Sequence, residues 1–178
     1  MINPLLSQRI SMIDLPVPLD TLVKNFYKKG FTLKTKSAES TILLGKVNDE
    51  TVEMIIYPTT MTKLVRKVTL KYPPHKKWKS LKKAYTERQT MMIEKYGPIK
   101  FQRLEFLPPY KEGKGKEFEA LAKQKAFWTT NWGDMPYNQN LFLELEASAD
   151  KCILIHFTLK DHALKHEEEK KMSQNSLF

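Results

Sequence analysis

Lysines are the residues of this sequence whose spacing best suits a chemical task, the electrostatic binding of an anion. Six of them are Lys63, Lys67, Lys71, Lys76, Lys79 and Lys83. The first three recur every four residues and share one face of a predicted strand, and the last three share one stripe of a predicted helix. If strand and helix adjoin, the six ammonium groups form one continuous positive surface. Such a surface binds phosphate groups in a strongly salt-dependent way.

The charge of the whole chain also indicates an anionic partner. The net charge is +10, and residues 1–100 hold 19 Lys and Arg against 8 Asp and Glu. This asymmetry favours a polyanion or an acidic protein surface as the partner of that part. The alternative is a solvated lysine-rich face, because charged side chains are ordinarily exposed. No nucleic-acid-binding motif accompanies the lysines.

An aromatic group offers a second candidate, a groove for a flat ligand. Its members are Phe127, Trp128, Trp132 and Tyr137. Trp128 and Trp132 lie four residues apart, so an unbroken strand would place both on one face as a ligand groove. The alternative is that these rings fill the core, as large aromatic side chains commonly do.

Histidine and carboxylate patterns do not indicate a metal. His162, His166 and Glu169 have helical ligand spacing, but no second ligand set is evident, and a solvated helix end is the expected state. His156 lies in a predicted strand, where a hydrogen-bonded structural histidine is the default. We predict no metal and no cofactor.

We also predict no catalytic residues. The chain has no Gly-x-Ser-x-Gly elbow and no phosphate-binding loop. Glu144 and Glu146 point the same way from one strand, yet nothing orients an acid against a base as general catalysis requires. The single cysteine, Cys152, is expected to be a buried, inert thiol.

The elements that must position these residues alternate between helices and strands. Helical spacing of apolar residues predicts helices over residues 18–29, 76–96 and 117–125. Strands are predicted over residues 40–47, 51–57, 62–72, 99–106, 126–132, 140–147 and 151–159. Most of these strands have one apolar and one polar face, which is typical of antiparallel sheets. The fold class is therefore α+β, with an antiparallel sheet of meanders and helices packed on one face.

The length of the chain suits one domain over residues 1–178. Residues 1–13 carry little pattern and are predicted to be an arm, and residues 161–178 a charged helical tail that frays at its end. No apolar run approaches the roughly 20 residues of a membrane span, so no transmembrane segment is expected.

Three stretches of the chain resemble a group of small uncharacterised bacterial proteins, many of them exported. The stretches are Leu15-Pro-Val-Pro-Leu-Asp20, Lys29-Gly-Phe31 and Glu94-Lys-Tyr-Gly-Pro98, the last preceded by Trp78, Leu81 and Tyr85. The resemblance implies an α+β fold with an antiparallel sheet, and no activity or functional residues. This sequence departs from the group in its positive charge and in lacking an export signal at its start. The cytoplasm is therefore the default expectation, and export is what the resemblance implies.

These observations leave three hypotheses for function. The leading one is a non-catalytic binding or interaction domain, because the core patterning is good and no catalytic set is visible. The second is a protein associated with nucleic acid or another polyanion through its lysine-rich face. The third is an enzyme whose site is assembled from residues distant in sequence, which a pocket with converging polar groups would support.

Overall fold

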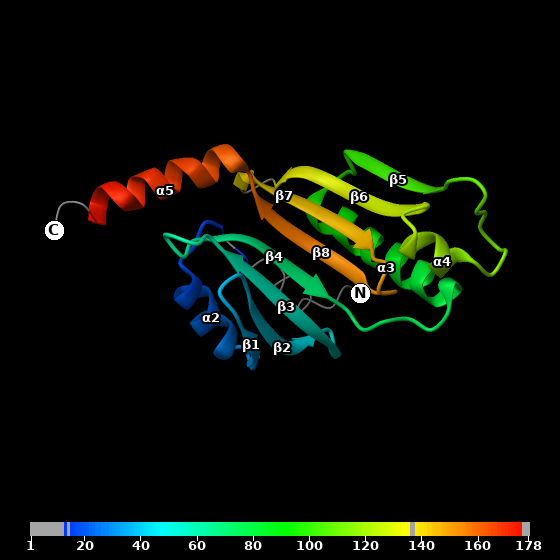
Figure 1. The fold of residues 1–178 in the computed structure, drawn as a ribbon, viewed down its shortest axis with the longest axis horizontal. Coiled ribbons are helices and arrows are strands. Elements are labelled where there is room, and N and C mark those ends of the chain that lie inside the picture. Colours follow the sequence, from blue (N-terminus) through cyan, green and yellow to red (C-terminus); the bar gives the residue numbers. More distant parts are fainter. Residues whose placement is uncertain (1–12, 14, 136–137, 176–178) are drawn as a thin grey trace.

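A computed structural model describes residues 13, 15–135 and 138–175 as one eight-stranded antiparallel sheet with helices (Figure 1). The first elements are α2 (Leu19–Tyr27), β1 (Thr32–Lys36), β2 (Thr41–Val47), β3 (Glu50–Pro58) and β4 (Val65–Lys71). There follow α3 (Trp78–Tyr96), β5 (Phe101–Phe106), α4 (Glu117–Ala122), β6 (Ala126–Met135), β7 (Asn138–Ala147), β8 (Ile153–Leu159) and α5 (Asp161–Asn175). The predicted fold class is confirmed.

The order of the strands divides the sheet into two halves. It runs β1-β2-β3-β4-β8-β7-β6-β5, so the last strand of each meander lies at the centre. We call α2 with β1–β4 the first half, and α3 with β5–β8 and α4 the second half. Each half is a helix followed by a four-stranded meander, and β4 pairs antiparallel with β8 to join them.

One face of the sheet is covered by helices and the other is open. Cross-strand pairing aligns Met54, Leu70, Ile155 and Leu145 on one face, where all four are buried. The helix α3 packs on this covered face and crosses behind β7 and β8 (Figure 1), and the Tyr85 hydroxyl donates to the Leu145 carbonyl at 3.3 Å. The prediction that helices pack on one face is confirmed.

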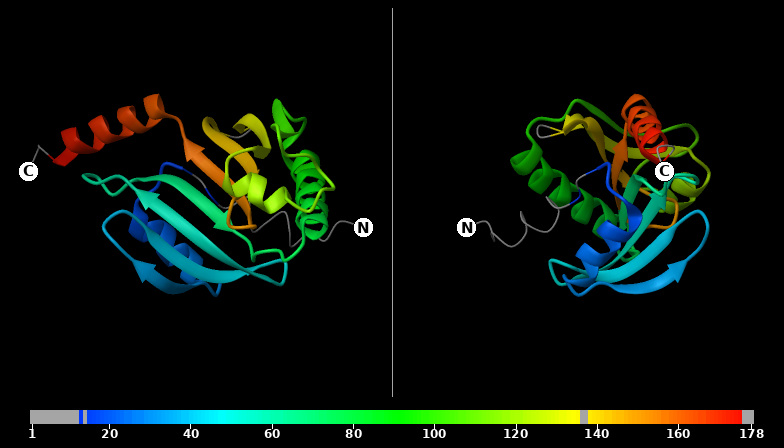
Figure 2. Two further views of the ribbon diagram at one scale, coloured as in Figure 1. Left: turned by 45° about the vertical axis from the view of Figure 1, so that its right-hand side comes forward. Right: turned by 90° about the vertical axis from the view of Figure 1, so that its left-hand side faces the viewer.

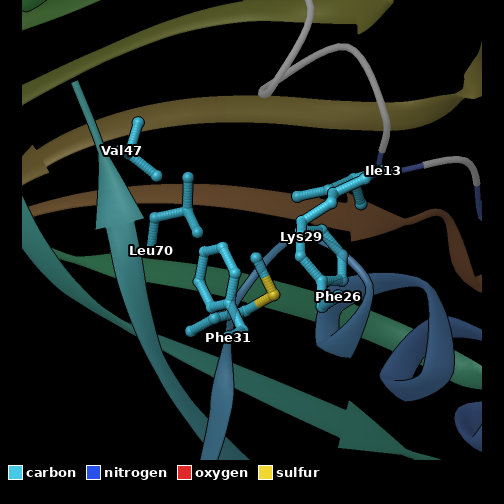
Figure 3. Close-up of a pocket in the computed structure, with 7 residues that line it drawn as sticks. Ile13, Phe26, Lys29, Phe31, Val47 and Leu70 are labelled. Carbon is cyan, nitrogen blue, oxygen red and sulfur yellow. The ribbon is translucent and has the colours of Figure 1, made fainter. Parts of the chain in front are cut away.

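In the first half, residues packed on the covered face surround a small apolar space (Figure 3). Phe26 of α2 and Phe31 meet edge to face there, with ring centroids 5.1 Å apart. Ile13 lines the same space and is fully buried, so the predicted arm over residues 1–13 is wrong at its last residue. Residues 1–12 lie outside the described part of the chain.

Three segments differ from the predicted strands. A bulge pairs Tyr57 with Lys67 but Pro58 with Val65, so Val65 points into the core and Arg66 outward. The strand predicted from residue 62 therefore begins at Val65. The edge strand β1 was not predicted because all five of its residues are exposed and it shows no apolar alternation. The strands predicted over residues 126–132 and 140–147 are longer than expected, since β6 continues to Met135 and β7 begins at Asn138.

The helix α5 leaves the sheet after β8 and projects from the end of the molecule (Figure 2). It contacts the β3–β4 connection, where Lys171 Nζ donates to the Thr62 carbonyl at 2.6 Å and Thr62 Oγ1 donates to Glu168 at 3.2 Å. Across the described ranges, every helix is too short or too polar to span a membrane.

Candidate polyanion-binding site

The structure divides the six lysines of the predicted positive surface. Lys67 and Lys71 alternate along β4 with buried Val68 and Leu70, so they lie on the open face of the sheet. Lys79 and Lys83 project from α3, which packs on the opposite, covered face, and Lys76 immediately precedes this helix. Lys63 lies in the turn before β4, with a φ of 55°. The expected continuous surface is therefore wrong, because strand alternation and helix packing send the two groups to opposite sides.

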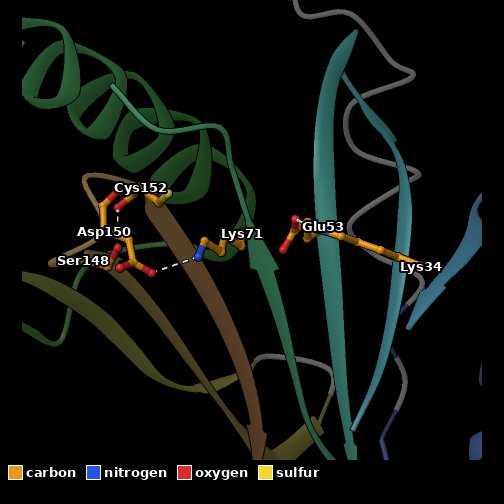
Figure 4. A network of polar contacts seen from close by, with 6 residues as sticks. All are labelled: Lys34, Glu53, Lys71, Ser148, Asp150 and Cys152. Carbon is orange, nitrogen blue, oxygen red and sulfur yellow. Dashed lines mark hydrogen bonds and ion pairs between the residues drawn. The ribbon is translucent and has the colours of Figure 1, made fainter. Parts of the chain in front are cut away.

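Two lysines on the open side, Lys71 and Lys34, have acidic partners (Figure 4). Lys71 Nζ lies 2.9 Å from the Asp150 carboxylate, whose hydrogen bond raises the pKa of Lys71, while the pKa of Asp150 is lowered in turn. Lys34 of β1 forms an ion pair with Glu53 of β3 across the intervening strand β2. This part of the open face is close to charge balance and offers little attraction to a polyanion.

The lysines at the start of α3 instead meet a second group from the connection between β5 and β6. Trp78 Nε1 donates to Glu112 at 3.0 Å, and Lys82 Nζ donates to the same carboxylate at 2.6 Å. These bonds, that of Lys82 foremost, lower the pKa of Glu112. The backbone of His75 bonds the Lys151 carbonyl at 2.9 Å, which brings the β7–β8 turn to the same place.

A buried carboxylate holds the β5–β6 connection in shape. Glu117 is only 5% exposed and accepts backbone N–H groups from Gly113 at 2.6 Å and Gly115 at 3.3 Å. Both glycines have positive φ, near 78° and 73°, which a residue with a side chain rarely adopts. The loop is thereby folded around Glu117, and its exposed lysines are Lys111, Lys114 and Lys116.

We call the three converging segments, residues 75–83, 107–125 and 148–152, the basic end. They lie together at the end of the molecule away from α5 (Figures 1 and 2). The basic end holds eleven lysines and four acidic residues, and so accounts for seven of the ten net positive charges of the chain. Its lysines are Lys76, Lys77, Lys79, Lys82, Lys83, Lys111, Lys114, Lys116, Lys123, Lys125 and Lys151.

The acidic residues of the basic end are already engaged. Glu112 and Glu117 have the partners given above, and Asp150 is paired with Lys71 on the open side. Glu119 accepts from Lys123 at 2.7 Å and from the Tyr110 hydroxyl at 2.8 Å. Eight of the eleven lysines have no acidic partner within ion-pair distance among the residues that the structure describes.

The predicted aromatic groove is core instead. Trp128 is 6% and Trp132 2% exposed, because α3 covers both. Trp128 packs edge to face on Trp78 at 4.9 Å, and Trp132 Nε1 donates to the Gly97 carbonyl at 3.0 Å. The ligand-groove hypothesis for the two tryptophans is wrong. Trp128 packs under the start of α3, and Trp132 bonds the residue that follows its end. Tyr137 lies outside the described residues.

The other histidines and the cysteine singled out in the sequence lie on α5 and in or next to β8. His162, His166 and Glu169 are exposed on α5. Cys152 is 2% exposed, and burial raises the pKa of its thiol. His156 is a buried, hydrogen-bonded residue of β8, as expected, with Thr69 at 2.9 Å.

Comparison with known proteins adds no relative. No protein-family model, curated protein or solved structure matches this chain. Sequence reasoning found the α3 lysines but missed that they adjoin the β5–β6 connection, since a contact between residues 78 and 112 leaves no local signal.

Proposed function

We propose that the protein is a non-catalytic binding domain that holds the phosphate backbone of nucleic acid against its basic end. The observation that carries the proposal is the convergence of three distant segments that together hold eleven lysines against four engaged acidic residues. Lysine is a compact point charge without the fork geometry of arginine, which favours backbone contacts over the reading of bases. We therefore expect binding that is independent of sequence.

The start of α3 adds to the positive potential. A helix N-terminus carries a partial positive charge and is stabilised by acidic side chains. The first turn of α3 has no acidic residue, and its N-cap, Lys77, makes no side-chain capping bond. Lys76 and Lys79 flank this uncapped end. Such an arrangement is unfavourable for the isolated helix and becomes favourable when an anion lies against it.

The charges also lie close enough to act together. The Debye length is about 10 Å at 0.1 M salt, and the side-chain contacts of Trp78 and Lys82 with Glu112 bring α3 and the β5–β6 connection well within that distance. The start of α3, which carries several of these lysines, rests on the buried ring of Trp128. Binding then requires ordering of lysine side chains but little change of the backbone.

The test is fluorescence anisotropy with a labelled, mixed-sequence DNA duplex at two salt concentrations. We expect wild-type binding to weaken steeply with salt. The logarithm of the binding constant should fall against the logarithm of the salt concentration with a slope of about −0.9 for each phosphate neutralised. A variant carrying Lys76→Gln, Lys79→Gln, Lys114→Gln and Lys116→Gln should bind at least about tenfold more weakly at low salt. Its slope should be shallower by roughly 2 to 4.

The control removes the same charge elsewhere. Lys24→Gln, Lys28→Gln, Lys36→Gln and Lys170→Gln change four exposed lysines outside the basic end. This variant should bind within about threefold of wild type if location matters more than net charge. Equal losses in both variants, or no wild-type binding at low salt, would overturn the proposal.

A further inference from the structure

A second cluster lies on the open face, away from the basic end. Glu144 and Glu146 are two residues apart on β7, and His156 of β8 is the cross-strand partner of Glu144. One ligand atom of each lies within 4.8 Å of the other two. The cluster therefore joins two carboxylates and an imidazole at one point on the central strands of the second half.

A hydrogen bond at the second ring nitrogen orients the histidine of this cluster. His156 is 8% exposed, and its Nδ1 lies 2.9 Å from the hydroxyl of Thr69, a buried residue of β4 directly across from it. The other ring nitrogen, Nε2, faces Glu146 at 3.2 Å. In metal sites a ligating histidine is oriented in this way, by a hydrogen bond to its non-ligating nitrogen.

The separation of His156 from Glu146 suits one small cation. Two ligands at about 2.0–2.1 Å from a tetrahedral zinc ion lie about 3.3 Å apart. The distance from His156 Nε2 to the Glu146 oxygen, 3.2 Å, is close to that value. Nε2 can donate its own hydrogen to Glu146, and a metal ion bound by the same carboxylate would take the place of that hydrogen.

Glu144 supplies the further observation. It is half-buried and makes no hydrogen bond or ion pair with residues that the structure describes. A carboxylate aimed beside another carboxylate, without a donor of its own, gains a partner when a divalent cation binds.

We propose that Glu144, Glu146 and His156 bind one first-row divalent metal ion, with Zn²⁺ as the favoured ion. Mixed carboxylate and imidazole ligands are compatible with zinc, and three protein ligands leave a fourth position for water or an external ligand on the open face. Thr69 is a positioning residue that acts through His156. The site is separate from the basic end and does not depend on the function proposed for it.

The test is calorimetric titration of Zn²⁺ into the metal-free full chain, followed by Co²⁺ titration read by its visible absorption spectrum. We expect one-to-one binding and a tetrahedral-type Co²⁺ spectrum. Glu144→Gln should weaken binding at least about tenfold without unfolding the protein, because Glu144 has no hydrogen bond or ion pair to lose among the described residues. Thr69→Val should weaken it by about tenfold through the freed imidazole.

The controls address surface histidines. A variant with His162→Gln and His166→Gln, both exposed on α5, should keep wild-type affinity and stoichiometry. Binding that survives Glu144→Gln unchanged but is lost in this α5 variant would overturn the proposal. Absence of saturable zinc binding by the folded wild type would also overturn it.

Discussion

The two halves of the molecule share an architecture but differ in one connection. In the first half, β1 and β2 are joined by residues 37–40, where Ser37 caps a tight turn. In the second half, the corresponding strands β5 and β6 are joined by residues 107–125, which contain α4 and the loop folded around Glu117. This longer connection supplies five of the eleven lysines of the basic end.

The elements that the two halves share form the scaffold, and the elements that differ carry the proposed function. The helix-and-meander unit occurs in both halves and serves to build and cover the sheet. The charge that we propose to bind polyanions is carried by the long connection, by residues at the start of the longer helix and by the β7–β8 turn. Functional groups placed on loops above a rigid scaffold are a common arrangement in proteins. The following predictions test whether the halves are one folded unit and whether they differ as described.

The largest expected effect is from Phe157→Ala at the junction of the halves. Phe157 is fully buried on β8 and pairs with Val68 of β4 and Leu143 of β7. Removing its ring should lower the free energy of unfolding by about 4 kcal/mol. Urea unfolding followed by tryptophan fluorescence, which reports the second half alone, and by far-UV circular dichroism measures it.

Both signals should shift together, because the β4–β8 pair makes the sheet one cooperative unit. Thr158→Ala, on the open face beside it, should change stability by less than about 1 kcal/mol. Two separate transitions in the wild type would show instead that the halves fold independently.

Arg88 of α3 makes the next contact between the halves. Its side chain is buried, forms an ion pair with Glu50 of β3, and stacks 4.0 Å from the ring centre of Tyr72. Arg88→Met should lower the free energy of unfolding by about 2 kcal/mol, since both the pair and the stacking are lost. Arg103→Met is the matched control, because Arg103 stacks on Phe127 within the second half at a more exposed position, and it should lose less than half as much.

Gly45 tests how the first half is covered. A methyl group at Gly45 would lie 2.4 Å from the Phe31 ring, which packs directly on the strand there. Gly45→Ala should therefore destabilise the protein by about 1–3 kcal/mol through displacement of that ring. Thermal unfolding measures the change, and a variant as stable as wild type would show that the short helix of the first half leaves Phe31 room to move.

The smallest expected effect concerns Glu112 and pH. Its pKa lies below the ordinary value of 4.5, because Lys82 and then Trp78 donate to its carboxylate. A lowered pKa means that the ionised group stabilises the fold above pH 4.5 and that this stabilisation is lost as the pH falls through the lowered value. Glu112→Gln should cost less than about 1 kcal/mol at pH 7, since the pair is partly exposed. The difference from wild type in urea unfolding should vanish at low pH, and a difference that is constant with pH would contradict the assignment.

Much of the fold could be predicted because its signals are local. Asn48 and Asp49 both have positive φ in the β2–β3 turn, as their residue types suggest for a two-residue hairpin. The alternation of apolar and polar residues is also a local signal, and it located most of the strands. The strand β1 and the bulge at Arg66 could not be found, since one is exposed on every residue and the other depends on pairing with Pro58.

The candidate site was less predictable because it is assembled from distant segments. Lys79 and Lys83 were recognised by helical spacing, and they do belong to the basic end. Their expected neighbours on β4 lie on the other face, since the sequence does not say which side of a sheet a following helix will cover. The cluster of Glu144, Glu146 and His156 requires the register between β7 and β8, which only the three-dimensional structure supplies.

The most direct test of the central claim is a backbone amide NMR titration of the full chain with a short, mixed-sequence DNA duplex at low salt. We predict that shift changes concentrate in residues 75–83, 107–125 and 148–152 and disappear when salt is raised. Changes centred on α2 and β1–β3, or on α5, would contradict the claim that the basic end is the binding surface.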